Sequence, residues 1–94
     1  SVIIFDEPFA NLDWPGVKQV CMILKKLKEE KKTIIVLTHE LEKILALAER
    51  FIVLDKGKIR FDGSPQEGLS QNLEQWSIRN PVAQYSSLKD LLWL

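Results

Sequence analysis

The sequence has a single cysteine, no long apolar run and no excess of charge of either sign. Cys21 alone can form neither an internal disulfide nor a cysteine metal cluster. No stretch approaches the ~20 apolar residues that a membrane-spanning helix needs, and no basic-then-apolar secretion signal heads the chain. Because 13 basic residues balance 13 acidic ones, the charge gives no reason to expect nucleic acid or an anionic membrane as the main partner. These absences favour a soluble domain of the cytosol.

Two short apolar runs, each followed by polar residues, are typical of strands in a parallel sheet. Residues 2–5 read VIIF and are followed by Asp6 and Glu7, and residues 34–37 read IIVL and end two positions before His39. Continuous apolar runs of this length predict strands that are buried on both faces.

A helix is expected between the two strands. Asp13 can cap its start, with Pro15 in the first turn, where a missing N–H costs nothing. An apolar stripe at three- and four-residue intervals follows, at Val17, Val20, Cys21, Leu24 and Leu27. Lysines near residue 30 suit the carboxyl end of this helix. A second helix is expected after Glu40, with an apolar side made by Leu41, Ile44, Leu45 and Ala48.

Residues 51–63 are typical of a hairpin. Phe51 to Leu54 would form the outgoing strand, Lys56-Gly57 the turn, and residues 59–61 the returning strand. The next four residues, SPQE, form a capping box that predicts a short helix starting at Pro65. The rest of the chain is less regular, with a break expected at Asn80-Pro81.

The alternation of strands and helices predicts an α/β fold in which crossover helices join parallel strands. A strand–helix–strand unit is almost always right-handed, and both of its strands end at the same edge of the sheet. Ligands of open α/β sheets bind outside this edge. Asp6, Glu7 and His39 are therefore expected to converge there.

These three side chains together suit the hydrolysis of a nucleoside triphosphate. A carboxylate at a strand end can hold Mg²⁺ through water, and a second carboxylate can orient or deprotonate an attacking water. A histidine can hydrogen-bond the charge that develops on a transferring phosphoryl group. Taken singly, each residue also has a plainer explanation, as part of a solvated loop or as an exposed histidine.

Four segments resemble, in order, the motifs of ATP-binding-cassette (ABC) transporter ATPase subunits. VIIFDEP at residues 2–8 resembles a Walker B motif with its following glutamate, and ANLD at residues 10–13 resembles the D-loop. TIIVLTHE at residues 33–40 resembles the strand that carries the switch histidine, and residues 48–67 resemble the downstream hairpin. The length beyond the hairpin is reminiscent of importer subunits of the energy-coupling-factor type, used for cobalt, nickel or vitamins.

The resemblance implies roles for individual residues. Asp6 would help to hold Mg²⁺ on ATP, Glu7 would polarise the hydrolytic water, and His39 would contact the γ-phosphate. Family members close head-to-tail around two ATP molecules, so the interface with a second ATPase domain would contain Asn11, Leu12 and Asp13. The family's D-loop usually starts with serine, and Ala10 replaces it here, so a hydrogen bond made by that serine hydroxyl has no counterpart.

Other family motifs are missing from the sequence. None of the 4 glycines lies in a G-x-x-x-x-G-K-[ST] phosphate loop, and the LSGGQ signature is absent. The chain is therefore identified as the part of an ABC ATPase from the Walker B strand onward, a partial P-loop NTPase core without its P-loop strand. Residues 1–64 would be the carboxyl-terminal half of the ATPase core and residues 65–94 a helical extension. We expect this chain alone to be inactive and to self-associate through the exposed sheet edge.

The implied parent protein is a Mg²⁺-dependent ATPase that powers a transporter, with import the expected direction. It would be cytoplasmic and bound to the inner face of the membrane through permease subunits. Two alternatives stay open. One is the ATPase of a DNA-repair or chromosome-maintenance protein, which the neutral charge and the transporter-type hairpin disfavour. The other is a non-catalytic interaction module that docks through the apolar LLWL at residues 91–94, although packing of that tail onto its own domain is the simpler expectation.

Overall fold

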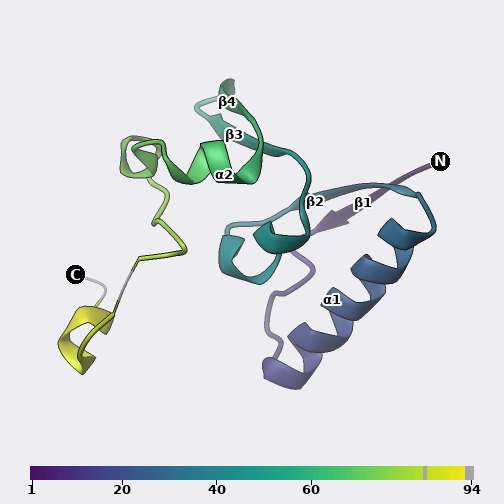
Figure 1. The fold of residues 1–94 in the computed structure, drawn as a ribbon, viewed down its shortest axis with the longest axis horizontal. Helices are drawn as coiled ribbons and strands as arrows, with labels where there is room; N and C mark the ends of the chain where they lie inside the picture. Colours follow the sequence, from purple (N-terminus) through teal and green to yellow (C-terminus); the bar gives the residue numbers. More distant parts are fainter. Residues whose placement is uncertain (84, 93–94) are drawn as a thin grey trace.

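The computed structural model describes residues 1–83 and 85–92. Strand β1 (Val2–Asp6), helix α1 (Trp14–Glu29) and strand β2 (Thr33–Leu37) follow one another along the chain. The two strands are parallel neighbours, with Ile3 opposite Ile34 and Asp6 opposite Leu37. The predicted strand–helix–strand unit is confirmed, and Figure 1 shows α1 lying along one side of the strand pair.

Helix α1 begins as its sequence predicts. The Asp13 side chain accepts a hydrogen bond from the Gly16 N–H at 3.0 Å, with Pro15 in the first turn. Lys26 and Lys28 lie in the last turn, where they oppose the negative end of the helix dipole. The apolar stripe of α1 packs against the strands, and we call the buried residues Phe9, Leu24 and Ile44, with the side chains around them, the first cluster.

Only one face of the β1–β2 sheet is covered by the described residues. Exposure alternates along both strands, so that every second side chain faces the first cluster. The opposite face, which we call the open face, carries Val2, Ile4, Ile35 and Leu37, whose exposed fractions are 59%, 62%, 44% and 46%. The expectation that both faces are buried is therefore wrong for the described part of the chain, because the first cluster covers one face and these four side chains stay exposed on the other.

The segment after Glu40 differs from its prediction. Instead of one α-helix, it forms two short 3₁₀ turns, η1 (Leu41–Lys43) and η2 (Leu45–Leu47). Ile44 joins them at φ −130°, outside the helical region. This break sends Ile44 into the first cluster and its neighbours Leu41 and Leu45 towards a different one. Because the apolar side chains serve two cores, a continuous helix face cannot satisfy both.

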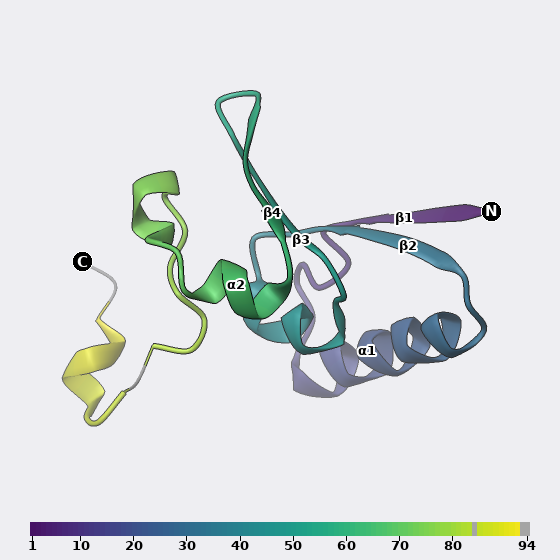
Figure 2. The same cartoon turned by 45° about the horizontal axis from the view of Figure 1, so that its top comes forward.

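The predicted hairpin is confirmed as strands β3 (Phe51–Asp55) and β4 (Lys58–Gly63). Lys56 and Gly57 have φ of 52° and 75°, the positive values that a two-residue hairpin turn of type I′ needs. Among the residues described, the hairpin forms a sheet of its own, separate from β1–β2. Figure 2 shows it extending away from the strand–helix–strand unit.

The hairpin also has one covered and one open face. Phe51, Val53 and Leu73 are buried together, and we call them the second cluster. The other face exposes Ile52, Leu54 and Ile59. Helix α2 (Pro65–Leu69) lies against the second cluster so closely that a Cβ on Gly68 would stand 2.2 Å from Cδ2 of Phe51. Only glycine fits at this contact.

The carboxyl-terminal third is mostly irregular. The predicted helix start is present, since the Ser64 hydroxyl oxygen accepts from the Glu67 N–H at 3.1 Å. After α2, the described residues contain two short 3₁₀ helices, η3 (Leu73–Trp76) and η4 (Leu88–Leu91), and both views place the last of them away from the sheets (Figures 1 and 2). The division of the chain into an ATPase core (residues 1–64) and a helical extension (residues 65–94) stays a prediction.

The apolar tail is partly exposed where it is described. Leu91 and Leu92 are 48% and 66% exposed, and Trp93 and Leu94 lie outside the described residues. No helix within the described ranges is long and apolar enough to cross a membrane.

Candidate functional site

The candidate site lies where β1 and β2 end side by side. The register puts Asp6, the last residue of β1, opposite Leu37, the last residue of β2. The Glu7 N–H then donates to the Leu37 carbonyl at 2.7 Å. This bond continues the pairing of the strands by one step, and so it holds Glu7 beside residues 38 and 39.

The Glu7 carboxylate is bound at both of its oxygens by the end of β2. Oε2 accepts from the Thr38 hydroxyl at 3.1 Å, and Oε1 accepts from the backbone N–H of His39 at 3.1 Å. The His39 Nε2 atom lies 3.8 Å from the same Oε1. That distance is too long for a hydrogen bond, and the contact is an ion pair only when His39 is protonated. The expected convergence of Glu7 and His39 is present in the geometry.

The two side chains differ in how far they face water. The His39 side chain is 99% exposed, whereas that of Glu7 is 36% exposed. The imidazole is therefore free to turn towards a ligand, while the carboxylate is held against the protein. A group held in this way can act on a bound molecule without first losing much conformational freedom.

The backbone at Glu7 adopts an unusual conformation. Its φ is 48°, in the left-handed region that residues with a Cβ rarely occupy, and Pro8 follows directly. Conformations of this kind persist where the surroundings hold them. Here the bonds to Leu37, Thr38 and His39 do so.

Asp6 directly precedes Glu7, at the last position of β1. It is exposed at the end of β1 and occupies the open-face side of the alternation that also exposes Ile4. No group of three or more His, Cys, Asp or Glu residues that could hold a metal ion exists in residues 1–83 and 85–92. One exposed carboxylate fits a Mg²⁺ ion that keeps most of its water and is held by few protein ligands.

The predicted interface residues lie in the loop between β1 and α1. The three side chains, those of Asn11, Leu12 and Asp13, are all exposed. Asn11 has a φ of 61°, and Asp13 caps α1. The loop is short and bonded to itself, with Ala10 N–H donating to the Glu7 carbonyl and Leu12 N–H to the Phe9 carbonyl, at 3.2 Å and 3.3 Å. The residues are thus presented at the same edge of the sheet as Glu7.

Two residues of this corner do not stand out in the sequence. Thr38 lies within the histidine motif, and its hydroxyl donates to Glu7. Phe9 is 1% exposed and anchors the loop in the first cluster. The sequence gives Phe9 no clear signal, because the same loop also contains the apolar Leu12, which is exposed. Thr38 had no separate signal, because its partner lies 31 positions earlier in the chain.

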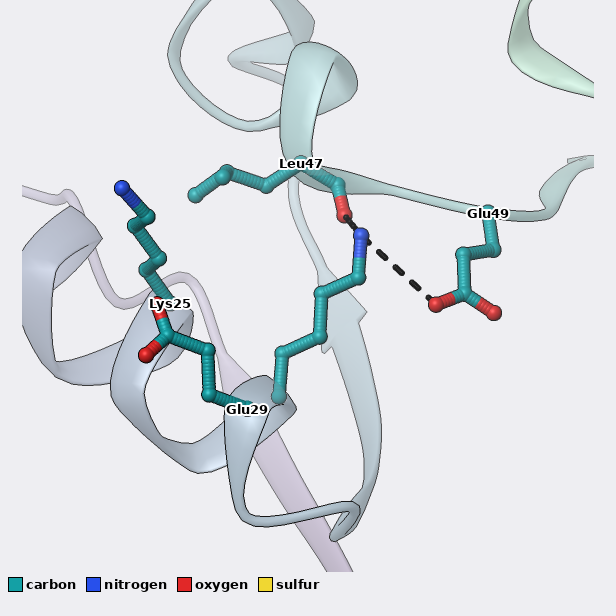
Figure 3. Close-up of a pocket in the computed structure, with 5 residues that line it drawn as sticks. Lys25, Glu29, Leu47 and Glu49 are labelled. Atoms are coloured by element: carbon teal, nitrogen blue, oxygen red, sulfur yellow. Dashed lines mark hydrogen bonds and ion pairs between the residues drawn. The ribbon is translucent and has the colours of Figure 1, made fainter.

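A concave feature lies elsewhere on the molecule. A shallow pocket of about 340 Å³ is lined by Lys25, Lys28, Glu29, Leu47 and Glu49. The Lys28 ammonium donates a hydrogen bond to the Leu47 carbonyl at 2.8 Å and lies 3.6 Å from the Glu49 carboxylate. Figure 3 shows Lys25 and Glu29 on α1, with Leu47 and Glu49 across the pocket from them. Three of the five lining residues come from the last turns of α1, which precede the start of β2, and so the pocket lies apart from the Glu7 corner. Lys28 and Glu49 form an ion pair across it, and the pocket lining contains none of the predicted site residues.

Comparison with known proteins agrees with the motifs. No family model matches the chain. The energy-coupling factor transporter ATP-binding protein EcfA2 of Mycoplasmoides gallisepticum is 47% identical over 98 aligned positions, covering 87% of this chain and 31% of that protein. The protein of the same name from Mycoplasmopsis synoviae is 51% identical over 83 positions, covering 86% and 27%.

A putative ABC transporter ATP-binding protein of Pyrococcus furiosus is 46% identical over 69 positions, covering 73% of this chain and 25% of that protein. The chain therefore spans less than a third of the length of these relatives. Over most of its own length, it is a homologue of the ABC transporter ATP-binding proteins.

Proposed function

We propose that this chain is part of the ATP-hydrolysing subunit of an ABC transporter of the energy-coupling-factor type, and that the subunit drives import. The relatives named as transporter ATP-binding proteins support the subunit class. The observation that supports hydrolysis is the Glu7 carboxylate, held by both oxygens at the edge where His39 is exposed. The division of labour below is part of the same proposal.

Glu7 acts on the water that attacks the γ-phosphate of ATP. Its carboxylate accepts a proton from that water as the new bond to phosphorus forms, and the bond to the bridging oxygen of ADP breaks. His39 turns its exposed imidazole towards the γ-phosphate and donates a hydrogen bond to the charge that develops there. Asp6 holds a Mg²⁺ ion through water, and this ion neutralises phosphate charge when bound.

The proposed subunit class also implies protein partners. Asn11, Leu12 and Asp13 contact a second ATPase domain, and the subunit binds permease subunits at the inner face of the membrane. The 94-residue chain has no phosphate loop, and it lacks the backbone amides and lysine that hold the phosphates of ATP in such proteins. We therefore propose that this chain alone binds ATP poorly and does not turn it over.

The proposal is tested with the full-length protein that contains this chain. Glu7→Gln keeps the shape of the side chain and removes the base, so we expect Mg²⁺-ATPase activity to fall by ~100-fold or more. Glu74→Gln, at an exposed position of η3, is the matched control and should leave the activity unchanged. Steady-state phosphate release measures both. Equal activity of the Glu7→Gln and wild-type proteins would refute the role of Glu7.

A parallel assay uses the 94-residue chain by itself. We expect no Mg²⁺-dependent phosphate release above background. Turnover by this chain that is lost on Glu7→Gln substitution would refute the proposal that a phosphate loop from outside it is needed.

A further inference from the structure

The Thr38 hydroxyl occupies the centre of a directed chain of hydrogen bonds. Its oxygen accepts from the Glu40 N–H at 3.0 Å and lies 3.1 Å from Oε2 of Glu7. A hydroxyl has one proton to donate. Since the Glu40 N–H can only donate, the Thr38 oxygen is its acceptor, and the single proton of Thr38 is left for the Glu7 carboxylate.

Thr38 and the backbone of His39 together fix the plane of the Glu7 carboxylate. An ionised carboxylate offers about four lone-pair positions. The Thr38 hydroxyl and the His39 N–H use one position on each oxygen. The remaining positions stay open on a side chain that is 36% exposed. The clamp therefore sets the direction of the carboxylate without occupying all of its capacity to accept a proton.

The two bonds of Thr38 differ in what they do. The bond from the Glu40 N–H spans two residues and is the local contact that a threonine makes in many turns. The bond to Glu7 spans 31 residues and joins the ends of two strands. A role confined to the turn would need only the first of these.

We propose that Thr38 is a positioning residue for Glu7, whose hydroxyl holds the carboxylate in the direction needed to accept the proton of the attacking water. This inference rests on the proposed ATPase function and names a further residue on which that function depends. Thr38 itself touches neither substrate nor metal in this role. Its removal leaves Glu7 present but held at only one oxygen, by the His39 N–H, so that the carboxylate plane is no longer fixed.

The test uses the full-length protein and three substitutions. Thr38→Val keeps the shape and removes the hydroxyl, and we expect kcat for ATP hydrolysis to fall ~10- to 100-fold while KM for ATP stays the same. Thr38→Ser restores the hydroxyl and should recover most of kcat. Thr33→Val is the matched control, because Thr33 is exposed at the opposite end of the same strand, and it should leave both parameters unchanged.

A structural measurement separates loss of the clamp from loss of the fold. In Thr38→Val, amide hydrogen exchange should accelerate at residues 39 and 40, which lose their ordered acceptors, and stay unchanged along α1. Acceleration throughout the protein, with a kcat that Thr38→Ser fails to recover, would assign Thr38 a structural role and overturn the inference.

The kinetic outcomes distinguish the two proposals. If the wild-type protein is active, Glu7→Gln is inactive and Thr38→Val keeps its kcat, the positioning role alone is overturned. A change confined to KM would overturn it as well. A full-length wild-type protein without ATPase activity would overturn the proposed function and, with it, the role given to Thr38.

Discussion

The two faces of the β1–β2 sheet are built from the same kinds of residue and have different surroundings. Ile34 packs into the first cluster, whereas its neighbour Ile35 is 44% exposed. Both belong to one apolar run whose composition gives no sign of the difference. A continuous apolar run therefore shows only that either face of the strand can be buried. Which face is buried depends on the elements that pack against it.

The hairpin repeats the contrast on a smaller scale. Val53 is 2% exposed and the adjacent Leu54 is 65% exposed. The open face of the hairpin differs from that of the parallel sheet in one respect, because it carries the ion pair of Arg50 with Asp62, which lies opposite Ile52. Charged groups of this kind are one means by which exposed sheets resist association.

The sharpest test of the comparison is a matched pair of substitutions on β2. Ile34→Ala removes side-chain atoms from the first cluster and should lower the free energy of unfolding by about 2–3 kcal/mol. Ile35→Ala at the neighbouring exposed position should lower it by about 1 kcal/mol, since it loses mainly strand propensity. Urea unfolding of the two variants measures the difference. Equal losses would mean that the two faces are covered alike in solution.

The open face should also govern association of the chain. Its four apolar side chains are exposed together, and β2 pairs only with β1 in the described part of the chain. We expect the 94-residue chain to self-associate at high concentration. Ile4→Lys places a charge in the middle of the open face and should shift the distribution towards monomer, as read by sedimentation velocity. A wild-type chain that stays monomeric at high concentration would contradict this expectation.

A smaller effect concerns pH and the hairpin. Arg50 donates two hydrogen bonds to the Asp62 carboxylate, at 2.7 Å and 2.5 Å, and they hold the pKa of Asp62 below its usual value. The contribution of this ion pair to folding stability is therefore fully present above the usual pKa of an aspartate. It is lost as the pH falls through the lowered pKa of Asp62. Asp62→Asn should lower the unfolding midpoint slightly at neutral pH, with the difference from wild type disappearing in acid.

The matched control for this pair is Asp55→Asn in the same hairpin, whose carboxylate lies 3.8 Å from Arg60 Nε. Its effect at neutral pH should be smaller, because this pair lacks the two-point contact. A difference between wild type and Asp62→Asn that persists unchanged in acid would argue that the Arg50 contact is not its source.

Much of the fold could be predicted because its signals are local. The cap at Asp13, the Lys56-Gly57 turn and the helix start at Pro65 each depend on residues a few positions apart, and each lies where the sequence indicates. The convergence of Glu7 and His39 was also predictable, because parallel strands must end at one edge. The roles of these residues stay predictions, and so do the expected Mg²⁺ and dimer contacts.

The rest depended on contacts that the sequence pattern does not encode. The apolar spacing of residues 41–48 fits a helix, but two separate clusters divide those side chains between them, and two 3₁₀ turns result. The burial of Phe9 and the bond from Thr38 to Glu7 arise only after the strands have paired. The spacing of apolar residues predicts one helix or strand at a time. The two 3₁₀ turns, the burial of Phe9 and the bond from Thr38 to Glu7 each depend on contacts between several elements.

Phe9 anchors the loop between β1 and α1 in the first cluster. The buried ring lies between Glu7 and the exposed residues 11–13, and the short loop bonds back to the carbonyls of Glu7 and Phe9. Lifting this loop far from the sheet would draw the ring into water, at a cost of roughly 1.5–3 kcal/mol for a fully buried phenylalanine. Movements of the loop that keep the ring buried avoid this free-energy cost, whereas detachment of the loop from the sheet does not.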